Sequence, residues 1–336
     1  MVKVGIIGAS GFTGAELLKI FRKHREAEIC FVTSRAGAGK KVGDLYPELA
    51  SYCQLEFIHP EDADLLKADI IFSCLPHGGS FETVKKAFTQ GVRVVDLSAD
   101  TRFKKSDNYS KWYDSLAGQQ SVLDESVYGL PEINREKIKN AMVVGNPGCY
   151  ATSLILPLFP LVSKRLIDIS GIICDSKSGV SGAGRGKAPF CDTNENFNAY
   201  KAGRSHRHIG EVEEVLFGAE FQQPGIIFTP HLLPLNRGIL STIYVKYANN
   251  AGAGELAEAL SAKYENEPFV TFSGERLPSI SEAAGNNMCI IGLQDIPGTD
   301  GALIVSVIDN LLKGASGQAV QNMNIMTGIN EEEGLI

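Results

Sequence analysis

Apolar runs and amphipathic stretches alternate through the first 147 residues of the chain. The apolar runs predict buried strands, and the stretches at 13–24 and 81–90 predict helices between them. Regular alternation of strands with helices is typical of a parallel sheet covered by helices. We therefore predict a Rossmann-type doubly wound α/β domain over residues 1–147. Its predicted strands lie at 2–8, 27–34, 68–76, 92–99 and 141–148.

The rest of the chain is richer in strand patterns. Six strand-like runs lie between residues 171 and 310, and one clear helical pattern, at 254–267, interrupts them. Strands with few helices between them favour an antiparallel or mixed sheet. We predict an α+β domain with a mostly antiparallel or mixed sheet, and a boundary at the Asn-Pro-Gly turn near residue 147. The segment after Ala315 has a helical pattern despite its glycines.

Composition and charge narrow the classes of partner. Hydrophobic residues make up 44% of the 336 residues and charged residues 21%, which is ordinary for a globular enzyme with two cores. The net charge of −7 disfavours nucleic acid or an anionic membrane as partner, although a local anion site remains compatible. No apolar stretch is long enough to cross a bilayer and no cleavable leader is recognisable, so we expect a cytoplasmic protein or a mature form that has already lost a transit segment. The seven cysteines are scattered without a CxxC pair, which argues against a disulfide framework and a structural metal.

A glycine-rich turn follows the first predicted strand and opens a helix. Its GxxGxxG spacing is a variant of the dinucleotide fingerprint, in which glycine lets the pyrophosphate approach backbone N–H groups. An NAD site usually has an acidic residue at the end of the second strand, but this chain has Ser34 and Arg35 there. A hydroxyl and a guanidinium suit a 2′-phosphate, so we predict NADP(H); the alternative is a solvated basic turn. The predicted cofactor contacts in the turn are Gly8, Ser10, Gly11, Phe12, Thr13 and Gly14.

Cys149 is the candidate nucleophile. It follows a predicted strand and the Asn146-Pro147-Gly148 turn, with Asn146 as expected N-cap and Pro147 as expected first helical residue. A cysteine in the first helical turn meets unsatisfied N–H groups and the helix dipole, which favour the thiolate. A cysteine beside a nicotinamide suggests that the thiolate attacks an activated acyl group and that hydride then reduces the thioester to an aldehyde. Cys74 is the nearest rival.

Histidine is the expected acid or base for this chemistry. We expect His24 and His59 at the surface. His206 and His208 flank Arg207, which favours an acid/base or anion-binding cluster over a metal site, because no third metal ligand is near. The pattern of residues does not choose between these two histidines.

A second glycine-rich segment, Ser178–Lys187, is another anion candidate. Its backbone N–H groups can form a nest, with Arg185 and Lys187 adding positive charge. An ordinary surface loop explains the pattern equally well.

A series of short motifs along nearly the whole chain points to a family. The most specific are NPGCYAT at 146–152 and KGASGQAVQNMN at 313–324. In these and in its other motifs, the chain resembles the N-acetyl-gamma-glutamyl-phosphate reductase family, which is related to aspartate-semialdehyde dehydrogenase. The other motifs are GASGFTGAELL (8–18), SCLPHG (73–78), DLSADTR (96–102), YGLPE (128–132), SGVSGAGR (178–185), HRHIGE (206–211) and TPHLLPLNRG (229–238).

The resemblance implies an NADPH-dependent enzyme of arginine biosynthesis that reduces N-acetyl-gamma-glutamyl phosphate to N-acetylglutamate 5-semialdehyde and releases inorganic phosphate. It implies that Cys149 accepts the acyl group and that His208, rather than His206, is the acid/base. It also implies a homodimer or homotetramer, a nucleotide domain completed by the helix at 313–336, and a catalytic and dimerisation domain at 148–312. The further implied contacts are Leu75, Pro76, Ser178, Gly179 and Asn322 for the cofactor, and Arg102, Asn146, Tyr200, His206, Arg207 and Arg237 for the substrate.

Two alternatives remain open at this point. Some relatives act on a glutamyl or aminoadipyl phosphate bound to a carrier protein in lysine biosynthesis. A protein of a different class, a non-catalytic NADP sensor, would share the fold, because fold does not determine function. A sensor has no need of a cysteine at a helix start or of the histidine and arginine cluster.

Overall fold

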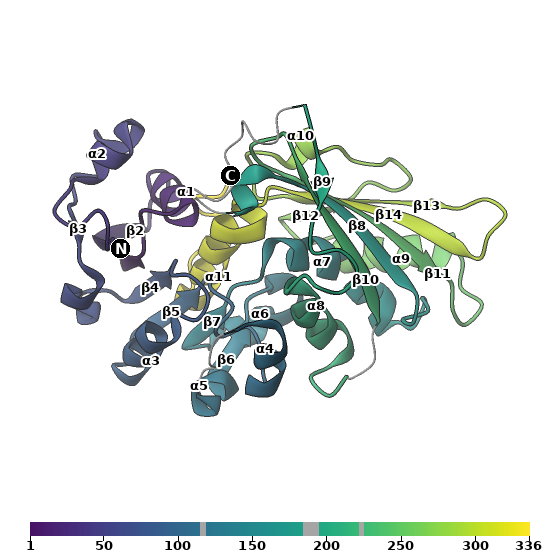
Figure 1. The fold of residues 1–336 in the computed structure, drawn as a ribbon, viewed down its shortest axis with the longest axis horizontal. Helices are drawn as coiled ribbons and strands as arrows, with labels where there is room; N and C mark the ends of the chain where they lie inside the picture. The colour runs from purple at the N-terminus through teal and green to yellow at the C-terminus, as the bar shows by residue number, and fades with distance from the viewer. Residues whose placement is uncertain (115–118, 184–194, 222–224) are drawn as a thin grey trace. The chain divides into compact units, whose positions relative to one another are not determined.

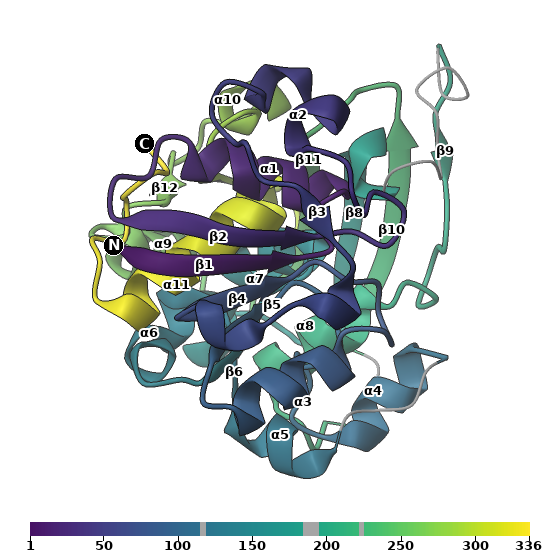
Figure 2. The ribbon, with the colours of Figure 1, turned by 90° about the vertical axis from the view of Figure 1, so that its left-hand side faces the viewer.

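The computed structural model describes residues 1–114, 119–183, 195–221 and 225–336. The chain divides into two compact units. The first comprises residues 1–147 and 315–336, and the second comprises residues 148–314. The first unit contains the strands β1 to β7 and the second contains β8 to β14; Figure 1 labels all of them except β1, which is labelled in Figure 2.

A parallel sheet forms the centre of the first unit. Its strands follow the order β3-β2-β1-β4-β5-β7-β6, and each neighbouring pair is parallel. The chain changes direction across the sheet between β1 and β4, and ligands of doubly wound sheets bind at the loops that follow such a pair. The prediction of a doubly wound parallel sheet is confirmed. The strands are β1 (Val2–Ile7), β2 (Ala27–Thr33), β3 (Phe57–Ile58), β4 (Ile70–Ser73), β5 (Arg93–Asp96), β6 (Ser126–Tyr128) and β7 (Val143–Gly145).

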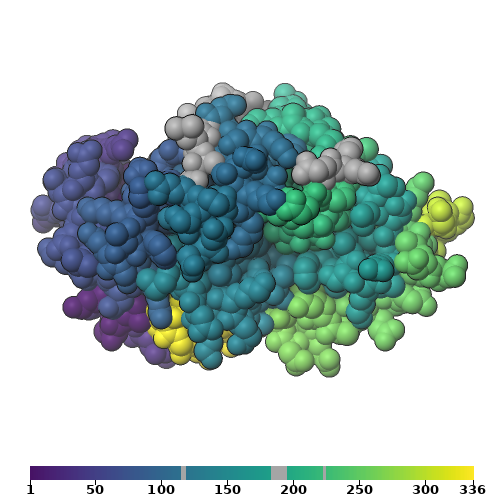
Figure 3. Space-filling view, turned by 90° about the horizontal axis from the view of Figure 1, so that it is seen from below, coloured from purple at the N-terminus to yellow at the C-terminus, as the bar shows by residue number. Residues whose placement is uncertain are grey.

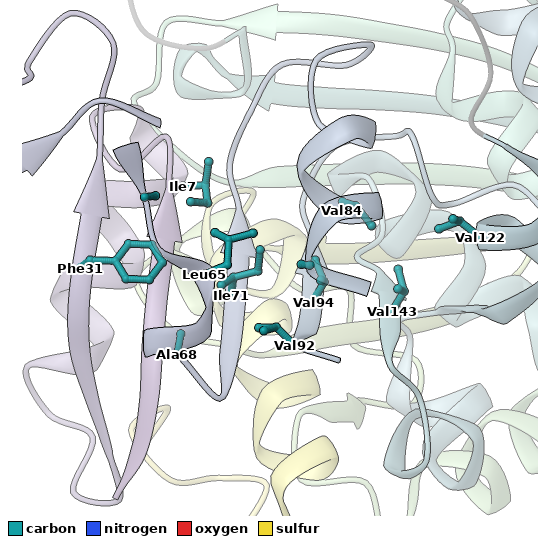
Figure 4. Close-up of a cluster of buried hydrophobic side chains, with 12 residues drawn as sticks. Ile7, Phe31, Leu65, Ala68, Ile71, Val84, Val92, Val94, Val122 and Val143 are labelled. Atoms are coloured by element: carbon teal, nitrogen blue, oxygen red, sulfur yellow. The ribbon is translucent and has the colours of Figure 1, made fainter. Parts of the chain in front are cut away.

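Helices cover both faces of this sheet, and α1 and α3 lie on opposite sides of the strands in Figure 2. Figure 4 shows the cluster on one face, where Ile71 and Val94 of the strands pack with Val84 of α3. On the other face Phe72 meets Phe21 of α1 edge-on, with ring centroids 5.6 Å apart. Burial of both faces explains the nearly continuous apolar runs. The helices are α1 (Phe12–Phe21), α2 (Val42–Leu45), α3 (Phe81–Thr89), α4 (Ser106–Trp112), α5 (Gln120–Glu125), α6 (Pro131–Lys139) and α11 (Gly317–Thr327), with short 3₁₀ turns at Pro47–Leu49, Pro60–Asp62 and Leu65–Lys67.

Buried polar contacts tie the C-terminal segment to the first unit. The Oδ1 atom of Asn324 lies 3.0 Å from Nε2 of His24, and Nδ2 of Asn324 donates to the carbonyl oxygens of Glu331 and Glu333. The Glu333 carboxylate accepts the backbone N–H of Arg25. In Figure 3 the yellow C-terminal residues accordingly lie beside the purple N-terminal residues. The expectation that His24 lies at the surface is wrong, because these contacts leave it only 6% exposed.

A mixed sheet forms the centre of the second unit. Its strands follow the order β12-β13-β14-β11-β8-β10-β9; the β8–β10 and β12–β13 pairs are parallel and the other pairs are antiparallel. The prediction of a mostly antiparallel or mixed sheet is confirmed. The strands are β8 (Ile172–Gly179), β9 (Asn198–Ala199), β10 (Ile226–Leu233), β11 (Ile239–Lys246), β12 (Val270–Phe272), β13 (Cys289–Asp295) and β14 (Gly301–Ile308).

The two faces of the mixed sheet have different environments. Helices α7, α8 and α9 pack on one face, where alternate residues such as Cys174, Phe228 and Ile243 are fully buried. On the opposite face Ile173 and Tyr244 are partly exposed. The helices are α7 (Cys149–Ser163), α8 (His208–Phe217), α9 (Ala253–Tyr264) and α10 (Ile280–Ala283), with a 3₁₀ turn at Val180–Ala183 and a π-helical turn at Leu312–Ser316.

No helix within the described residues is both long enough and apolar enough to span a lipid bilayer.

Candidate functional site

The glycine turn after β1 is shaped by backbone contacts that leave no room for side chains. Gly8 has φ +80°, and a Cβ atom there would lie 3.0 Å from the carbonyl oxygen of Cys74. A Cβ atom on Gly14 would lie 2.5 Å from the Cα atom of Ala9. Helix α1 therefore begins close against the turn, with Gly11 as its N-cap. The N–H groups of its first turn suit the pyrophosphate of a dinucleotide, so the cradle fits the predicted cofactor.

The remaining turn residues and the end of β2 are linked by serine hydroxyls. Ser34 is 2% exposed; its hydroxyl donates to Oγ of Ser10 at 2.8 Å and accepts the backbone N–H of Gly37 at 3.0 Å. Ser34 thus fixes the shape of the cradle, while Arg35 beside it is exposed. Phe12 and Thr13, like Ser10, are partly exposed.

The loop after β4 lies beside the glycine turn. A Cβ atom on Gly8 would lie 3.3 Å from Cδ2 of Leu75, and Pro76 follows as an exposed residue. This loop is fastened to the one after β5, because the Asp100 carboxylate accepts the N–H groups of Gly78, Ser80 and Phe81. Leu75 and Pro76 therefore lie next to the cradle because β4 pairs with β1 and because Asp100, after β5, holds the rest of their loop. The motif SCLPHG alone does not reveal this arrangement.

Arg102, Asn146 and Asn322 form one buried network in the first unit. The Arg102 guanidinium donates to the carbonyl oxygens of Asn146 at 2.7 Å and Leu97 at 2.9 Å. Nδ2 of Asn322 donates to Oδ1 of Asn146 at 3.1 Å and to the carbonyl oxygen of Gly129 at 2.9 Å. Within the described residues, the buried Oδ1 atom of Asn322 accepts no hydrogen bond. It is an acceptor that a ligand amide would satisfy.

Cys149 is the first residue of α7 and is partly exposed. The expected helix start, with Asn146 as N-cap and Pro147 as first helical residue, is wrong: the N-cap is Gly148, and the Asn146 side chain is engaged by Asn322 and by the carbonyl oxygen of Ala315. The N–H of Gly148 donates instead to Oε1 of Glu211 at 2.8 Å. Glu211 is 1% exposed and belongs to α8. Sequence reasoning missed this contact, although Glu211 closes the HRHIGE motif.

An aromatic and histidine cluster surrounds the start of α7. The Tyr150 and Tyr200 hydroxyls are 3.0 Å apart, and the ring of His206 lies 4.8 Å from that of His208, centroid to centroid. Burial raises the pKa of Tyr200 to about 12, and nearby Cys149 adds a smaller electrostatic contribution in the same direction. Burial also raises the pKa of Tyr150, and the neighbouring Tyr200 and Cys149 raise it further. Tyr200 and both histidines thus lie in the same part of the second unit as Cys149.

The two histidines have different environments. His206 is 9% exposed, and burial, with the charges of Lys201 and Arg207, lowers its pKa to about 3. It is therefore neutral at ordinary pH, and its Nδ1 atom accepts the backbone N–H of His208 at 3.2 Å. His208 begins α8 and is partly exposed, as is Arg207, its N-cap. A histidine that stays neutral throughout the working pH range is a poor proton donor, so this difference favours His208 as the acid/base.

The end of β8 contributes two further predicted residues. The Ser178 hydroxyl donates to the carbonyl oxygen of Gly179. A Cβ atom on Gly179 would lie 2.7 Å from the backbone nitrogen of Arg237, so only glycine fits there. NH1 of Arg237 lies 3.3 Å from Oδ2 of the buried Asp309, a partner that the sequence analysis missed. Arg185 and Lys187, predicted to complete an anion nest, lie outside the described residues.

Other thiols are less suited to nucleophilic chemistry. Burial raises the pKa of Cys74, the rival nucleophile, to about 12. Burial also raises the pKa of Cys30, Cys53 and Cys174. In the part of the chain that the structure describes, no group of three or more His, Cys, Asp or Glu side chains is arranged to hold a metal ion.

Two protein-family models match the chain, one for each domain. A semialdehyde dehydrogenase NAD binding domain matches residues 3–141, and a semialdehyde dehydrogenase dimerisation domain matches residues 149–310. The match to a domain of the first kind supports a nicotinamide cofactor.

Relatives similar over their full length carry a common name. The N-acetyl-gamma-glutamyl-phosphate reductase of Geobacter metallireducens is 49% identical, covering 100% of this chain and 98% of its own length. The protein of the same name from Pelotomaculum thermopropionicum is 48% identical, covering 99% of this chain and 97% of its own length.

Solved structures share the fold at low identity. Aspartate semialdehyde dehydrogenase II of Vibrio cholerae superposes with a TM-score of 0.73 at 20% identity, over 98% of this chain and 99% of that one. The aspartate semialdehyde dehydrogenase of Candida albicans, solved with NADP, gives a TM-score of 0.71 at 19% identity, over 97% of this chain and 98% of that one.

Proposed function

Because the chain belongs to the N-acetyl-gamma-glutamyl-phosphate reductase family, we propose that it reduces N-acetyl-gamma-glutamyl phosphate to N-acetylglutamate 5-semialdehyde through a thioester on Cys149. The observation that carries the proposal is the place of Cys149, partly exposed at the start of α7 and grouped with His208 and two tyrosines. Nucleophile and proton carrier on neighbouring helix starts are what acyl transfer requires.

The acyl-transfer step begins at the sulfur of Cys149. His208 accepts the thiol proton, and the thiolate attacks the acyl carbon of the substrate. A carbon–sulfur bond forms, the carbon–oxygen bond to the phosphate breaks, and the proton on His208 passes to the departing phosphate oxygen. NADPH, when held by the glycine cradle, would supply the hydride for the acyl carbon. The carbon–sulfur bond then breaks as the aldehyde forms, and one proton taken up from solvent through His208 returns Cys149 to the thiol with which the cycle began.

An anionic substrate calls for positive charge at its binding site. Arg237, 24% exposed and oriented by Asp309, and Arg207 at the start of α8 are the groups of the second unit that we assign to this task. Arg102 in the first unit is the group that we assign to the phosphate; its guanidinium is held by two carbonyl oxygens. Planar guanidinium groups suit such oxyanions because they donate two parallel hydrogen bonds.

NADPH is the form of the cofactor that we propose. The support is the exposed Arg35 beside Ser34, where NAD sites usually carry an acidic residue. The glycine cradle at residues 8–14, with Leu75 and Pro76, would hold the pyrophosphate end, and Asn322 with its buried acceptor would face the nicotinamide. Ser178 and Gly179 of the second unit are proposed as further nicotinamide contacts.

Self-association is proposed through the open face of the mixed sheet. Ile227, Ile173 and Tyr244 are neighbours across β10, β8 and β11, and they are 50%, 45% and 43% exposed. A row of exposed apolar residues on a sheet is typical of an interface, and this face belongs to the segment that matches a dimerisation domain. We propose a second copy of this chain as the partner. Ile173→Asp should shift the protein toward the monomer in sedimentation analysis; an unchanged mass would contradict this surface.

The activity itself is tested by a substrate comparison. The forward assay offers free N-acetyl-gamma-glutamyl phosphate, aspartyl phosphate and carrier-bound acyl phosphates, each with NADPH and with NADH. We expect the free N-acetylated substrate with NADPH to give the highest kcat/KM, by about tenfold or more over each other pair. Higher kcat/KM for a carrier-bound substrate would move the enzyme to the lysine-type branch, and a preference for NADH would refute the cofactor assignment.

A further inference from the structure

Asp309 is a fully buried carboxylate at the end of β14 whose contacts point in two directions. Its Oδ2 atom lies 3.3 Å from NH1 of Arg237 and accepts the N–H of Gly285 at 2.7 Å. Its Oδ1 atom accepts the N–H groups of Leu311 and Leu312, at 2.8 and 3.1 Å. One carboxylate thus fixes both an arginine side chain and the course of the following turn.

The turn after Asp309 leads to a contact with Cys149. The N–H of Gly314 donates to the carbonyl oxygen of Asp309 at 2.9 Å. A Cβ atom on Gly314 would lie 2.8 Å from Cβ of Cys149 and 3.3 Å from its Cα. Gly314 therefore lies directly against the cysteine, inside the π-helical turn Leu312–Ser316. π-Helical turns are rare in proteins, and those that occur are often found at functional sites.

The burial of this charge needs a reason. Taking a carboxylate out of water is costly, and replacing a buried ion pair with apolar side chains is often neutral or stabilising. Arg237 is 24% exposed, and Asp309 restrains its guanidinium through NH1. A restraint of this kind lowers the entropy that an arginine loses when it binds an anion.

We propose that Asp309 is a positioning residue for the thioester chemistry, holding Arg237 in place for an anionic substrate and holding Gly314 against Cys149. The inference rests on the proposed function, in which Cys149 is the nucleophile and Arg237 a substrate contact. Asp309 touches neither substrate nor cofactor; it acts through these two residues.

The test compares Asp309→Asn, Arg237→Gln and the double variant. Three quantities are measured: kcat and KM for the acyl phosphate, the rate at which iodoacetamide alkylates Cys149, followed by peptide mass spectrometry, and the melting temperature. Glu282→Gln is the matched control, because Glu282 is also paired with an arginine, Arg276, but at the surface. The control should leave KM and the alkylation rate within about twofold of the wild-type values.

The variants separate the two proposed roles of Asp309, holding Arg237 and holding Gly314. Asp309→Asn and Arg237→Gln should each raise KM by about tenfold or more. The KM of the double variant should be no higher than that of Arg237→Gln alone, because Asp309 affects substrate binding only through Arg237. Asp309→Asn should also change the Cys149 alkylation rate by about fivefold or more, whereas Arg237→Gln should not. Additive KM effects, or an alkylation rate that Asp309→Asn leaves unchanged, would overturn the proposal.

Folding of the variants is controlled separately. Asp309→Glu keeps the charge and moves the carboxylate by one methylene, so it should raise KM in the same direction even if Asp309→Asn does not fold. If neither variant folds, Asp309 is a structural residue and the proposal is wrong. A wild-type protein without reductase activity would instead refute the proposed function, and the alkylation arm can still be measured in that case.

Discussion

The glycine turn at residues 8–14, in the first unit, and the turn before Cys149, in the second, each lead into a helix N-terminus with a proposed function, but they are built differently. In the glycine turn, backbone atoms fill the space that side chains would need: those of Cys74, just after β4, at Gly8, and those of Ala9, within the turn, at Gly14. At Cys149, side chains from distant segments position the turn: Glu211 accepts the N–H of Gly148, and Asp309 fixes the turn that contains Gly314. Binding a common diphosphate requires only backbone N–H groups, whereas orienting one sulfur requires several separate restraints.

This difference separates binding from chemistry. Changes in the glycine turn should act on cofactor affinity, and changes around Cys149 should act on turnover or on the reactivity of the thiol. Four measurements test that separation.

The largest expected effect follows the loss of the nucleophile. Cys149→Ser should lower kcat by about 1,000-fold or more, because a hydroxyl at this position is a far weaker nucleophile than a thiolate. The affinity for NADPH, measured by fluorescence titration, should stay within about twofold, since the cradle belongs to the other unit. Cys30→Ser is the control, because a serine can keep the hydrogen bond of Cys30 to the carbonyl oxygen of Val4. Turnover near the wild-type level in Cys149→Ser would show that Cys149 is not the nucleophile.

The next effect tests the proton carrier. His208→Asn should lower kcat by about 100-fold and remove a limb of the pH–rate profile, because general acid–base catalysis typically contributes 10²–10⁴-fold. His206→Asn should lower kcat less and keep the limb, since the pKa of His206 is held at about 3 by burial and neighbouring positive charge. A limb that disappears with His206 and survives without His208 would exchange the two assignments.

A smaller effect is expected in the glycine turn. A methyl group on Gly14 would lie 2.5 Å from Cα of Ala9, so Gly14→Ala should push α1 away from the turn and weaken NADPH binding by about 30-fold, or roughly 2 kcal/mol. The alkylation rate of Cys149 should not change. Gly254→Ala on α9, where a Cβ atom has nothing within 4 Å, should have no effect on binding. Equal NADPH affinities in the two variants would show that the cradle is not sterically determined.

The smallest effect is the pH dependence of stability from His206. Its pKa is about 3 in the folded protein and about 6.5 when unfolded, so the unfolded state binds the extra proton and stability falls as the pH drops below about 6.5. Between pH 7 and pH 6 this group should cost about 0.7 kcal/mol of unfolding free energy. Comparing urea unfolding of the wild type and His206→Gln isolates the contribution. The same slope in both proteins would mean that His206 is accessible to protons in the folded state.

The sequence predicts local features well and assembled features poorly. The order of strand and helix patterns predicted the two types of sheet, because repeated strand–helix alternation is typical of a parallel sheet and strands with few helices between them favour an antiparallel or mixed one. The spacing of the glycines located the cradle, because a dinucleotide-binding turn needs glycine at fixed positions along the sequence. The N-terminus of α7 was misplaced by two residues, because Asn146 is engaged by Asn322 and Ala315, far along the chain, rather than by the helix. Glu211 and Asp309 were missed as partners of Gly148 and Arg237, since a buried carboxylate leaves no local pattern. His24 was misjudged for the same reason, as its cover comes from the last residues.

The attachment of the C-terminal segment to the first unit has a consequence for synthesis. The second unit is one unbroken stretch, 148–314, whereas the first needs residues 315–336 to complete it. Domains generally fold as units while the chain emerges from the ribosome. The later-encoded unit can therefore reach its final structure first, and the earlier half must wait, incomplete, until translation supplies α11 and the contacts around Asn324.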